Sequence, residues 1–196
     1  MLQTWILPIV LSYLIGSISF SYMIAKLTKG IDIRNHGSGN AGATNTLRVL
    51  GKLPGIIVFI LDALKGMAAV GIGYLLANGE MAVWMSCGIA AIAGHNWPIF
   101  LRFRGGKGIA TTIGVTSILV FFPALGAGIL AILFIMVTRY VSLGSLIYTA
   151  SLPIFIMLFD SNSSVYFWLS LVMMVLAIIR HKENIVNLLK GKERKI

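Results

Sequence analysis

A short loop of small, uncharged residues carries the clearest chemical signal in this sequence. Residues 37–45 read Gly-Ser-Gly-Asn-Ala-Gly-Ala-Thr-Asn and lie between two very hydrophobic runs, with Arg34, Arg48 and Lys52 on either side. Glycines let successive backbone N–H groups point toward one centre, and the Ser, Asn and Thr side chains add further donors. The composition therefore predicts a loop that binds a phosphate group at a membrane surface.

A second glycine-rich loop, Arg104-Gly105-Gly106-Lys107-Gly108, precedes another apolar run. Exposed backbone N–H groups, two cations and the start of a helix together favour phosphate binding. The loop is not a Walker A motif, because the spacing differs and Gly108 stands where Ser or Thr would hold magnesium. A basic loop beside a membrane span is often only a topology anchor, but a second anion loop in the same chain favours binding.

Two further polar segments begin at Thr138 and at Arg180. A basic run after a last helix commonly lies among lipid headgroups, which accounts for the lysines of the tail. It does not account for His181 and Asn184, which at a spacing of three residues share one helix face. Ser142 follows Arg139 at the start of another apolar run and falls at a similar depth.

The elements that position these segments are membrane helices. The chain has 196 residues, of which 58% are hydrophobic and 11% charged, whereas soluble domains carry about a quarter charged residues. The net charge of +10 fits the excess of Lys and Arg in cytoplasmic loops better than nucleic-acid binding. Cys87 lies in an apolar run and is expected to be a core residue.

Runs long enough to cross a bilayer lie near residues 5–25, 54–77, 81–101, 143–159 and 163–179. Residues 109–138 are also without charge but hold Pro123, so they form either one long kinked span or two short ones. With two spans, every Lys and Arg outside the spans falls on one side of the membrane. With one, Arg139, Arg180 and the tail would lie outside, against the positive-inside rule.

We therefore predict an all-α integral membrane protein with seven transmembrane helices in a single domain, 1–196. Its N-terminus lies outside and its C-terminus in the cytoplasm, and the two middle spans are short, at about 109–122 and 124–138. In this arrangement the glycine-rich loops, Ser142 and the tail all face the cytoplasm.

Asp62 and Lys65 lie inside the second predicted span, where ionisable side chains normally face other helices and pair. At a spacing of three residues they can neutralise each other, which we favour; the alternative is that Asp62 orients a cation of the site. His95 is expected to pack under the second loop, and His36 to be solvated. No cluster of Cys, His and carboxylate side chains has metal-ligand spacing, so we expect no bound metal and no other cofactor.

Four segments in this order, GSGNAGATNTLR (37–48), GHNWPIFLRFRGGKG (94–108), TRYVSLGS (138–145) and RHKENI (180–185), resemble the bacterial acyl-phosphate-dependent glycerol-3-phosphate acyltransferases, the PlsY family. The resemblance covers essentially the whole chain. It implies an inner-membrane enzyme, facing the cytoplasm, that moves a fatty acyl group from acyl phosphate to the sn-1 hydroxyl of glycerol 3-phosphate. The products would be lysophosphatidic acid and inorganic phosphate, in the first acylation step of phospholipid synthesis. Asn187 departs from the family, which tends to have a basic residue there.

On this resemblance the first loop is expected to bind acyl phosphate through Gly37, Ser38, Gly39, Asn40, Ala41, Gly42, Thr44 and Asn45. Glycerol 3-phosphate is expected to contact Arg48, Arg104, Gly105, Gly106, Lys107, Ser142, His181 and Asn184. The expected catalytic residues are Lys107, Ser142, His181 and Asn184. Acyl phosphate has a good leaving group, so positioning and charge stabilisation can suffice. Either the substrate phosphate or His181 accepts the hydroxyl proton.

We expect a monomer whose partners are these two substrates and membrane lipid. A transient contact with the enzyme that makes acyl phosphate is a further candidate interaction. Two other classes compete. A transporter of phosphorylated anions would also use cationic, glycine-rich loops, but transporters bind near the midplane and usually consist of repeated halves. A structural subunit with a lipid-binding basic face leaves the neutral first loop unexplained.

Overall fold

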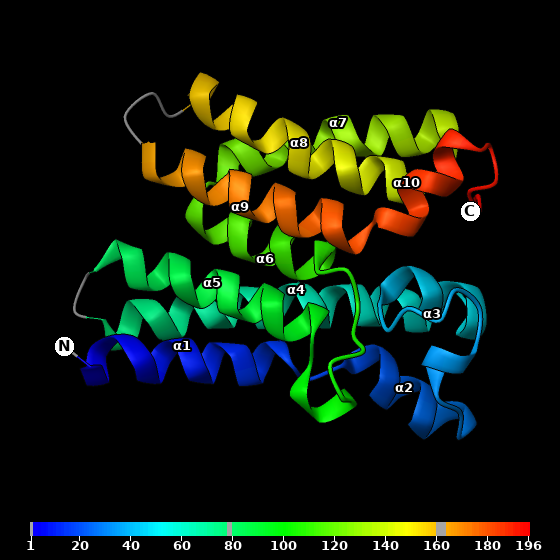
Figure 1. The fold of residues 1–196 in the computed structure, drawn as a ribbon, viewed down its shortest axis with the longest axis horizontal. Coiled ribbons are helices and arrows are strands. Elements are labelled where there is room, and N and C mark those ends of the chain that lie inside the picture. The colour runs from blue at the N-terminus through cyan, green and yellow to red at the C-terminus, as the bar shows by residue number, and fades with distance from the viewer. Residues whose placement is uncertain (1, 78–79, 160–163) are drawn as a thin grey trace. The chain divides into compact units, whose positions relative to one another are not determined.

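The computed structural model describes residues 2–77, 80–159 and 164–196, and its regular structure in these ranges is helical (Figure 1). The chain divides into two compact units, Met1–Leu119 and Val120–Ile196. Both glycine-rich loops lie in the first unit, and Ser142, His181 and Asn184 lie in the second. Each unit is described by itself.

The first unit is built around its longest helix. It consists of α1 (Leu2–Gly16), α2 (Phe20–Lys29), the short 3₁₀ turn η1 (Ile33–Asn35), α3 (Ala43–Leu50), α4 (Lys52–Leu76), α5 (Met81–Asn96), the turn η2 (Ile99–Leu101) and α6 (Ile109–Leu119). Helices α1, α2, α3, α5 and α6 all contact α4, and the long helices run alongside one another (Figure 1). Small residues allow close approach: Gly66 of α4 lies against the backbone of Thr111, and Gly16 against that of Ala91.

The second unit consists of α7 (Phe121–Thr138), α8 (Val141–Phe159), α9 (Ser164–Arg180) and α10 (Lys182–Leu189). Helix α8 packs between α7 and α9, and α9 and α10 are bent by 67° relative to each other. The C-terminal tail folds back toward the α7–α8 turn, where the backbone N–H of Ile196 donates to the carbonyl of Arg139 over 3.0 Å.

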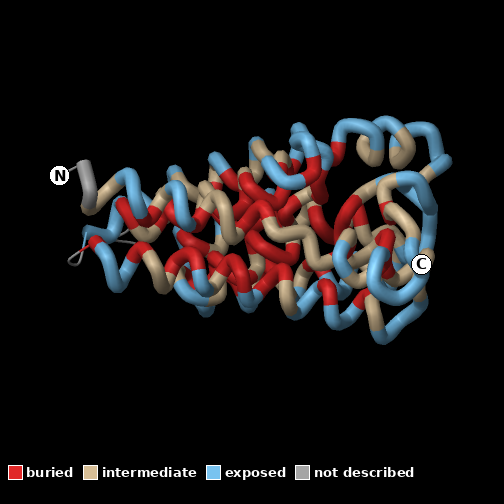
Figure 2. Tube along the Cα trace, turned by 90° about the horizontal axis from the view of Figure 1, so that it is seen from below, coloured by how far each residue is buried: buried red, intermediate tan, exposed pale blue. Residues whose placement is uncertain are grey.

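Four helical segments of the described chain are long and apolar enough to cross a membrane, namely Thr4–Lys29, Lys52–Leu76, Phe121–Thr138 and Val141–Phe159. The bent pair α9–α10 makes a fifth if it counts as one span. Exposed and buried stretches alternate along the long helices (Figure 2), and large apolar side chains such as Leu75 and Val137 are 76% and 84% exposed. Lipid tails are the natural neighbour of such surfaces.

The predicted break within 109–138 is confirmed, but its predicted position is wrong. Helix α6 ends at Leu119, Val120 leaves the helical conformation (φ −147°, ψ 65°), and α7 begins at Phe121. Pro123 thus lies in the first turn of α7, where a missing backbone N–H costs no intrahelical hydrogen bond. The two segments are 109–119 and 121–138 rather than 109–122 and 124–138.

Two other predicted spans also differ from the helices. The span 81–101 ends as a helix at Asn96, since Pro98 starts a separate turn. The span 5–25 contains a break at residues 17–19, after which the Ser19 side chain caps α2 by accepting from the N–H of Tyr22. Residue 163 of the last predicted span lies outside the described residues.

Candidate active site

The first glycine-rich loop is held in shape by a buried amide. Asn45, 1% exposed, accepts from the N–H of Ser38 at 2.8 Å and donates to the carbonyls of Ile33 and His36 at 3.2 and 2.9 Å. Gly37 has a φ of +63° and lies against the Asn45 side chain, so a larger residue would collide there. The structure therefore makes Asn45 a brace of the loop, whereas the sequence predicted it as a direct phosphate ligand.

The first loop ends at the start of α3, whose first residue is Ala43. Gly42 is the N-cap of α3 and, as a glycine, has no side chain with which to cap the first N–H groups of the helix. The first backbone N–H groups of a helix have no intrahelical acceptor and carry partial positive charge. Ser38 is exposed, and Asn40 and Thr44 are half-buried, so their polar groups remain accessible. Exposed donors at a helix start are the kind of groups that phosphate-binding sites use.

The second loop returns over the end of α5. After η2 the backbone turns sharply through Arg102 and Phe103, both with positive φ (54° and 61°). The N–H of Gly106 then donates to the carbonyl of His95 over 3.0 Å. A side chain at Gly105 would strike the end of α5, and one at Gly106 would strike the His95 ring. Glycine at both positions therefore allows the second loop to lie directly against the end of α5. Beside them, Lys107 is half-buried and Arg104 is exposed.

The two loops are in direct contact within the first unit. A Cβ built on Gly106 would lie 2.9 Å from the carbonyl oxygen of Ala41, in the first loop. A second link is Arg34, whose Nη1 donates to the carbonyl of Leu101 over 2.9 Å. The two predicted loops thus lie side by side, and no pattern of residue types indicated either contact.

Arg34 serves as a brace for the loops. Its Nη2 lies 2.7 Å from Oδ2 of Asp32, and its guanidinium lies over the Tyr22 ring. The hydrogen bonds from Arg34 hold the pKa of Asp32 below its ordinary value, with a smaller contribution from the charge of Arg104. In turn Asp32 raises the pKa of Arg34. From the sequence, Arg34 is predicted only as a cation that flanks the first loop.

Under the loops, Asp62 and Lys65 form the predicted ion pair, with 2.7 Å between Oδ1 and Nζ. The prediction that His95 packs under the second loop is also confirmed, because its ring lies against Gly106. Its Nδ1 lies 3.5 Å from Oδ1 of Asp62, a contact that was not predicted.

In the second unit the predicted residues gather around a carboxylate that was not predicted. Oε1 of Glu193, in the tail, accepts from Ser142 Oγ at 2.8 Å and from Asn184 Nδ2 at 2.7 Å. Ser142 comes from the start of α8 and Asn184 from α10, so the tail joins two helices. The available signal was an acidic residue inside an otherwise basic tail.

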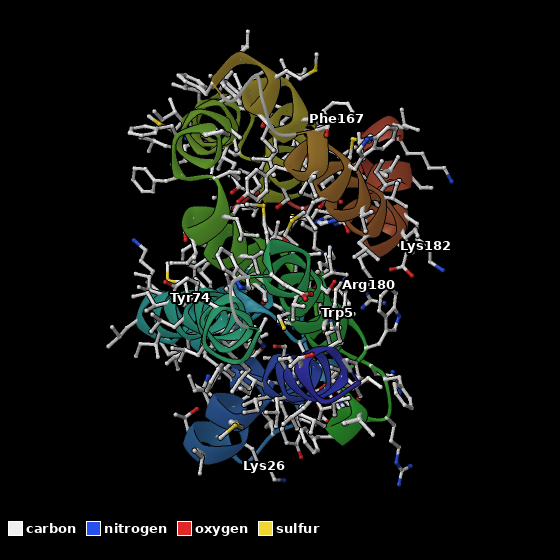
Figure 3. All side chains as sticks on the ribbon, turned by 90° about the vertical axis from the view of Figure 1, so that its left-hand side faces the viewer. Trp5, Lys26, Tyr74, Phe167, Arg180 and Lys182 are labelled. Carbon is white, nitrogen blue, oxygen red and sulfur yellow. The ribbon has the colours of Figure 1, made fainter. Side chains whose placement is uncertain are left out.

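His181 occupies the bend between α9 and α10, which Arg180 and Lys182 mark in Figure 3. It is 2% exposed, and its Nδ1 lies 2.8 Å from the carbonyl of Ala177. Because a carbonyl oxygen only accepts, Nδ1 is the donor, and a neutral ring then carries its lone pair on Nε2. The backbone contact thus leaves Nε2 as the basic nitrogen of a neutral His181 ring.

The predicted site residues therefore form two sets. The first unit brings together the loops 37–45 and 104–108, and Arg48 lies half-buried on α3, just after the first loop. The second unit connects Ser142 and Asn184 through Glu193 and has His181 at the adjoining bend. Within the described ranges, no group of three or more His, Cys, Asp and Glu side chains could hold a metal ion.

Comparisons with known proteins cover nearly the whole chain. A family model described as glycerol-3-phosphate acyltransferase matches residues 6–191. A glycerol-3-phosphate acyltransferase of Shouchella clausii is 50% identical over 200 residues, covering 100% of this chain and 98% of the relative. One from Halalkalibacterium halodurans is 51% identical over 196 residues, covering 98% and 95%.

Two crystal structures of PlsY, an integral membrane glycerol 3-phosphate acyltransferase, are also similar. The glycerol 3-phosphate form has a TM-score of 0.91 and 40% identity, and covers 97% of this chain and 94% of that protein. The lysophosphatidic acid form has a TM-score of 0.88 and 38% identity, with the same coverage.

Proposed function

Because the chain belongs to the glycerol-3-phosphate acyltransferase family of PlsY enzymes, we propose that it transfers a fatty acyl group from acyl phosphate to the sn-1 hydroxyl of glycerol 3-phosphate. The observation that carries this proposal is the contact between the two glycine-rich loops at Ala41 and Gly106. A reaction between two phosphorylated substrates needs two neighbouring anion sites, and these loops have that chemistry.

In the proposed reaction, the sn-1 hydroxyl oxygen attacks the carbonyl carbon of acyl phosphate. The new ester C–O bond forms, the C–O bond to phosphate breaks, and inorganic phosphate leaves with the bonding electron pair. The hydroxyl proton passes either to the phosphate or to His181. Since the mixed anhydride is already activated, the protein contributes mainly orientation and stabilisation of charge.

We assign acyl phosphate to the first loop, with the accessible groups of Ser38, Asn40 and Thr44 and the start of α3 as donors. Asn45 acts there by bracing the loop. For glycerol 3-phosphate we propose the contacts that the family resemblance implies, namely Arg48, Arg104, Gly105, Gly106, Lys107, Ser142, His181 and Asn184. Lys107, Ser142, His181 and Asn184 are the proposed catalytic residues. Glu193 orients two of them through the hydrogen bonds described above.

The proposed setting is the bacterial inner membrane, with the site facing the cytoplasm and the enzyme acting as a monomeric single domain. Seven spans result if α5, α6 and α9 cross the membrane together with the four longer segments. The positive-inside rule supports this topology, because both glycine-rich loops and the basic tail then face the cytoplasm.

The decisive assay uses the purified protein in detergent with acyl phosphate and glycerol 3-phosphate. Phosphate release that depends on both substrates, with the acyl group on the sn-1 oxygen of the product, supports the proposal. A parallel reaction with acyl-CoA tests the donor. If neither donor reacts and the protein instead carries glycerol 3-phosphate into vesicles, it is a transporter.

The variant His181→Gln distinguishes the two proton acceptors. Glutamine keeps much of the side-chain size and a hydrogen-bonding amide but cannot accept a proton at neutral pH. Loss of turnover by about 10²–10⁴-fold, with glycerol 3-phosphate binding retained, indicates that His181 is the base. Turnover within about tenfold of wild type indicates that the substrate phosphate accepts the proton.

A further inference from the structure

We infer that Asp62, Lys65 and His95 form a buried linkage that positions the two glycine-rich loops relative to each other. They are positioning residues, since none belongs to either loop. This inference deepens the proposed function and rests on it, because the loops are taken as the two substrate sites.

The linkage centres on one carboxylate oxygen inside the helical bundle of the first unit. Oδ1 of Asp62 lies 2.7 Å from Nζ of Lys65, one turn along α4. The same oxygen lies 3.5 Å from Nδ1 of His95, on α5. All three side chains are at most 5% exposed. Ionisable groups at such depth in a membrane protein are costly and usually serve a site.

One arm of the linkage reaches the second loop through His95. The Nε2 edge of its ring lies against Gly106, and its own carbonyl accepts the N–H of that glycine over 3.0 Å. Asp62 on one side of the ring and Gly106 on the other leave little freedom for rotation. The carboxylate of Asp62 therefore holds the His95 ring in place, and the ring in turn sets the position of Gly105 and Gly106 above the end of α5.

The other arm reaches the first loop through Lys65. Its Nζ donates to the carbonyl of Ile18 over 2.7 Å, in the break between α1 and α2, and lies 5.6 Å from the centre of the Phe20 ring. Helix α2 is joined to α3 by a buried hydrogen bond of 2.7 Å between the hydroxyls of Ser21 and Thr46. The first loop lies between α2 and α3, so Lys65 sets the frame that carries it.

Stability alone does not explain the linkage. Replacing a buried ion pair by apolar residues of similar volume is often neutral or stabilising, whereas removal of one partner leaves an uncompensated charge. A purely structural pair should therefore be dispensable when both ions are removed together. A pair that positions the loops should not be dispensable, because removing both ions also removes the hydrogen bond from Lys65 to Ile18 and the contact between Asp62 and His95.

The test compares Asp62→Asn, Lys65→Met and the double variant, with Ser12→Ala as control. Ser12 is also fully buried and donates from α1 to the carbonyl of Ala69 on α4, but it reaches neither loop. For each protein, the melting temperature and the kcat and KM for both substrates are measured. Nitroxide labels on His36→Cys and Phe103→Cys, in a Cys87→Ala background, report the loop separation by dipolar broadening without any need for activity.

We expect both single variants to melt below wild type and the double variant to recover most of the melting temperature. The double variant should still lose at least about tenfold in kcat/KM, since a displacement on the order of 1 Å can cost 10²-fold, and its label distribution should broaden. Ser12→Ala should keep wild-type kinetics and label separation. The inference is overturned if activity and label separation recover with the melting temperature.

A double variant that does not fold is replaced by His95→Phe, which keeps the ring volume without its nitrogens, and His95→Gln. His95→Phe should broaden the label distribution, and wild-type separation and kinetics in it would also overturn the linkage. If wild-type protein shows no acyl transfer but the variants still broaden the distribution, the linkage stands and the proposed function fails.

Discussion

Gly106→Ala tests the contact between the loops with a single added methyl group. The methyl would overlap Nε2 of His95 and lie 2.9 Å from the carbonyl oxygen of Ala41, closer than real Cβ contacts allow. The oxygen is backbone and the imidazole is held by Asp62, so the loops must separate. Overpacking of this kind costs about 1–3 kcal/mol, or a loss of roughly 2–4 °C in Tm per kcal/mol.

Catalysis should suffer more than stability. A separation on the order of 1 Å between two substrate sites can lower turnover about 10²-fold, so we expect kcat/KM to fall by one to two orders of magnitude (about 10–10²-fold) while most of the protein stays folded. The assay is phosphate release dependent on both substrates, measured beside thermal unfolding in detergent.

Gly71→Ala is the matched control for this change. Gly71 lies in α4, and an added Cβ there meets no atom within 4 Å. Alanine should stabilise this helix by about 0.5–1 kcal/mol and leave the kinetics unchanged. If Gly106→Ala keeps kcat/KM within about twofold of wild type, the loops are not coupled sites and the argument from their contact is refuted.

The remaining predictions concern the other braces of the site. Glu193→Ala removes both hydrogen bonds to Ser142 and Asn184, each worth about 1.5–3 kcal/mol when the acceptor is charged, so thermal unfolding should show a loss of about 3 kcal/mol in stability and activity should fall. Glu193→Gln keeps an acceptor and should lose about half as much stability. Equal losses in the two variants would mean that the charge of Glu193 does not strengthen these hydrogen bonds. The pKa of Asp32 is held below 3.8, so its stabilisation is complete above that pH and is lost as the pH falls through the lower folded value; an acid titration of Tm should show this loss in wild type and not in Asp32→Asn. Arg34→Lys keeps the charge but not the fork of donors, and we expect KM for glycerol 3-phosphate to rise severalfold, whereas an unchanged KM would mean that Arg34 does not order the loops.

Local chemistry in this chain could be predicted from its sequence. The composition indicated membrane helices, the glycine-rich segments indicated two loops, and the i, i+3 spacing of Asp62 and Lys65 indicated their pairing. The break within 109–138 was also indicated, although Pro123 suggested the wrong position. A proline disrupts a helix only beyond its first turn, and sequence alone does not say on which side of it the helix lies.

Contacts between distant segments could not be predicted in the same way. Asn45 is a residue type that often binds phosphate, but its hydrogen bonds to Ser38, Ile33 and His36 make it a brace of the first loop. The approach of His95 to Asp62 depends on how α5 packs on α4, and that of Glu193 to Ser142 on the return of the tail. Each depends on contacts between segments that no local pattern of residue types specifies.

The spacing of Asp62 and Lys65 also bears on how the protein enters the membrane. Both ions lie on a single helix, one turn apart, so they can cancel each other while α4 leaves the insertion machinery, before any neighbouring helix has arrived. A lone charge at the centre of an inserting helix costs about 2.5–3.5 kcal/mol. A polypeptide that kept only one of the two would meet that barrier during biogenesis, and reduced yield of membrane-integrated protein would then precede any defect in the finished enzyme.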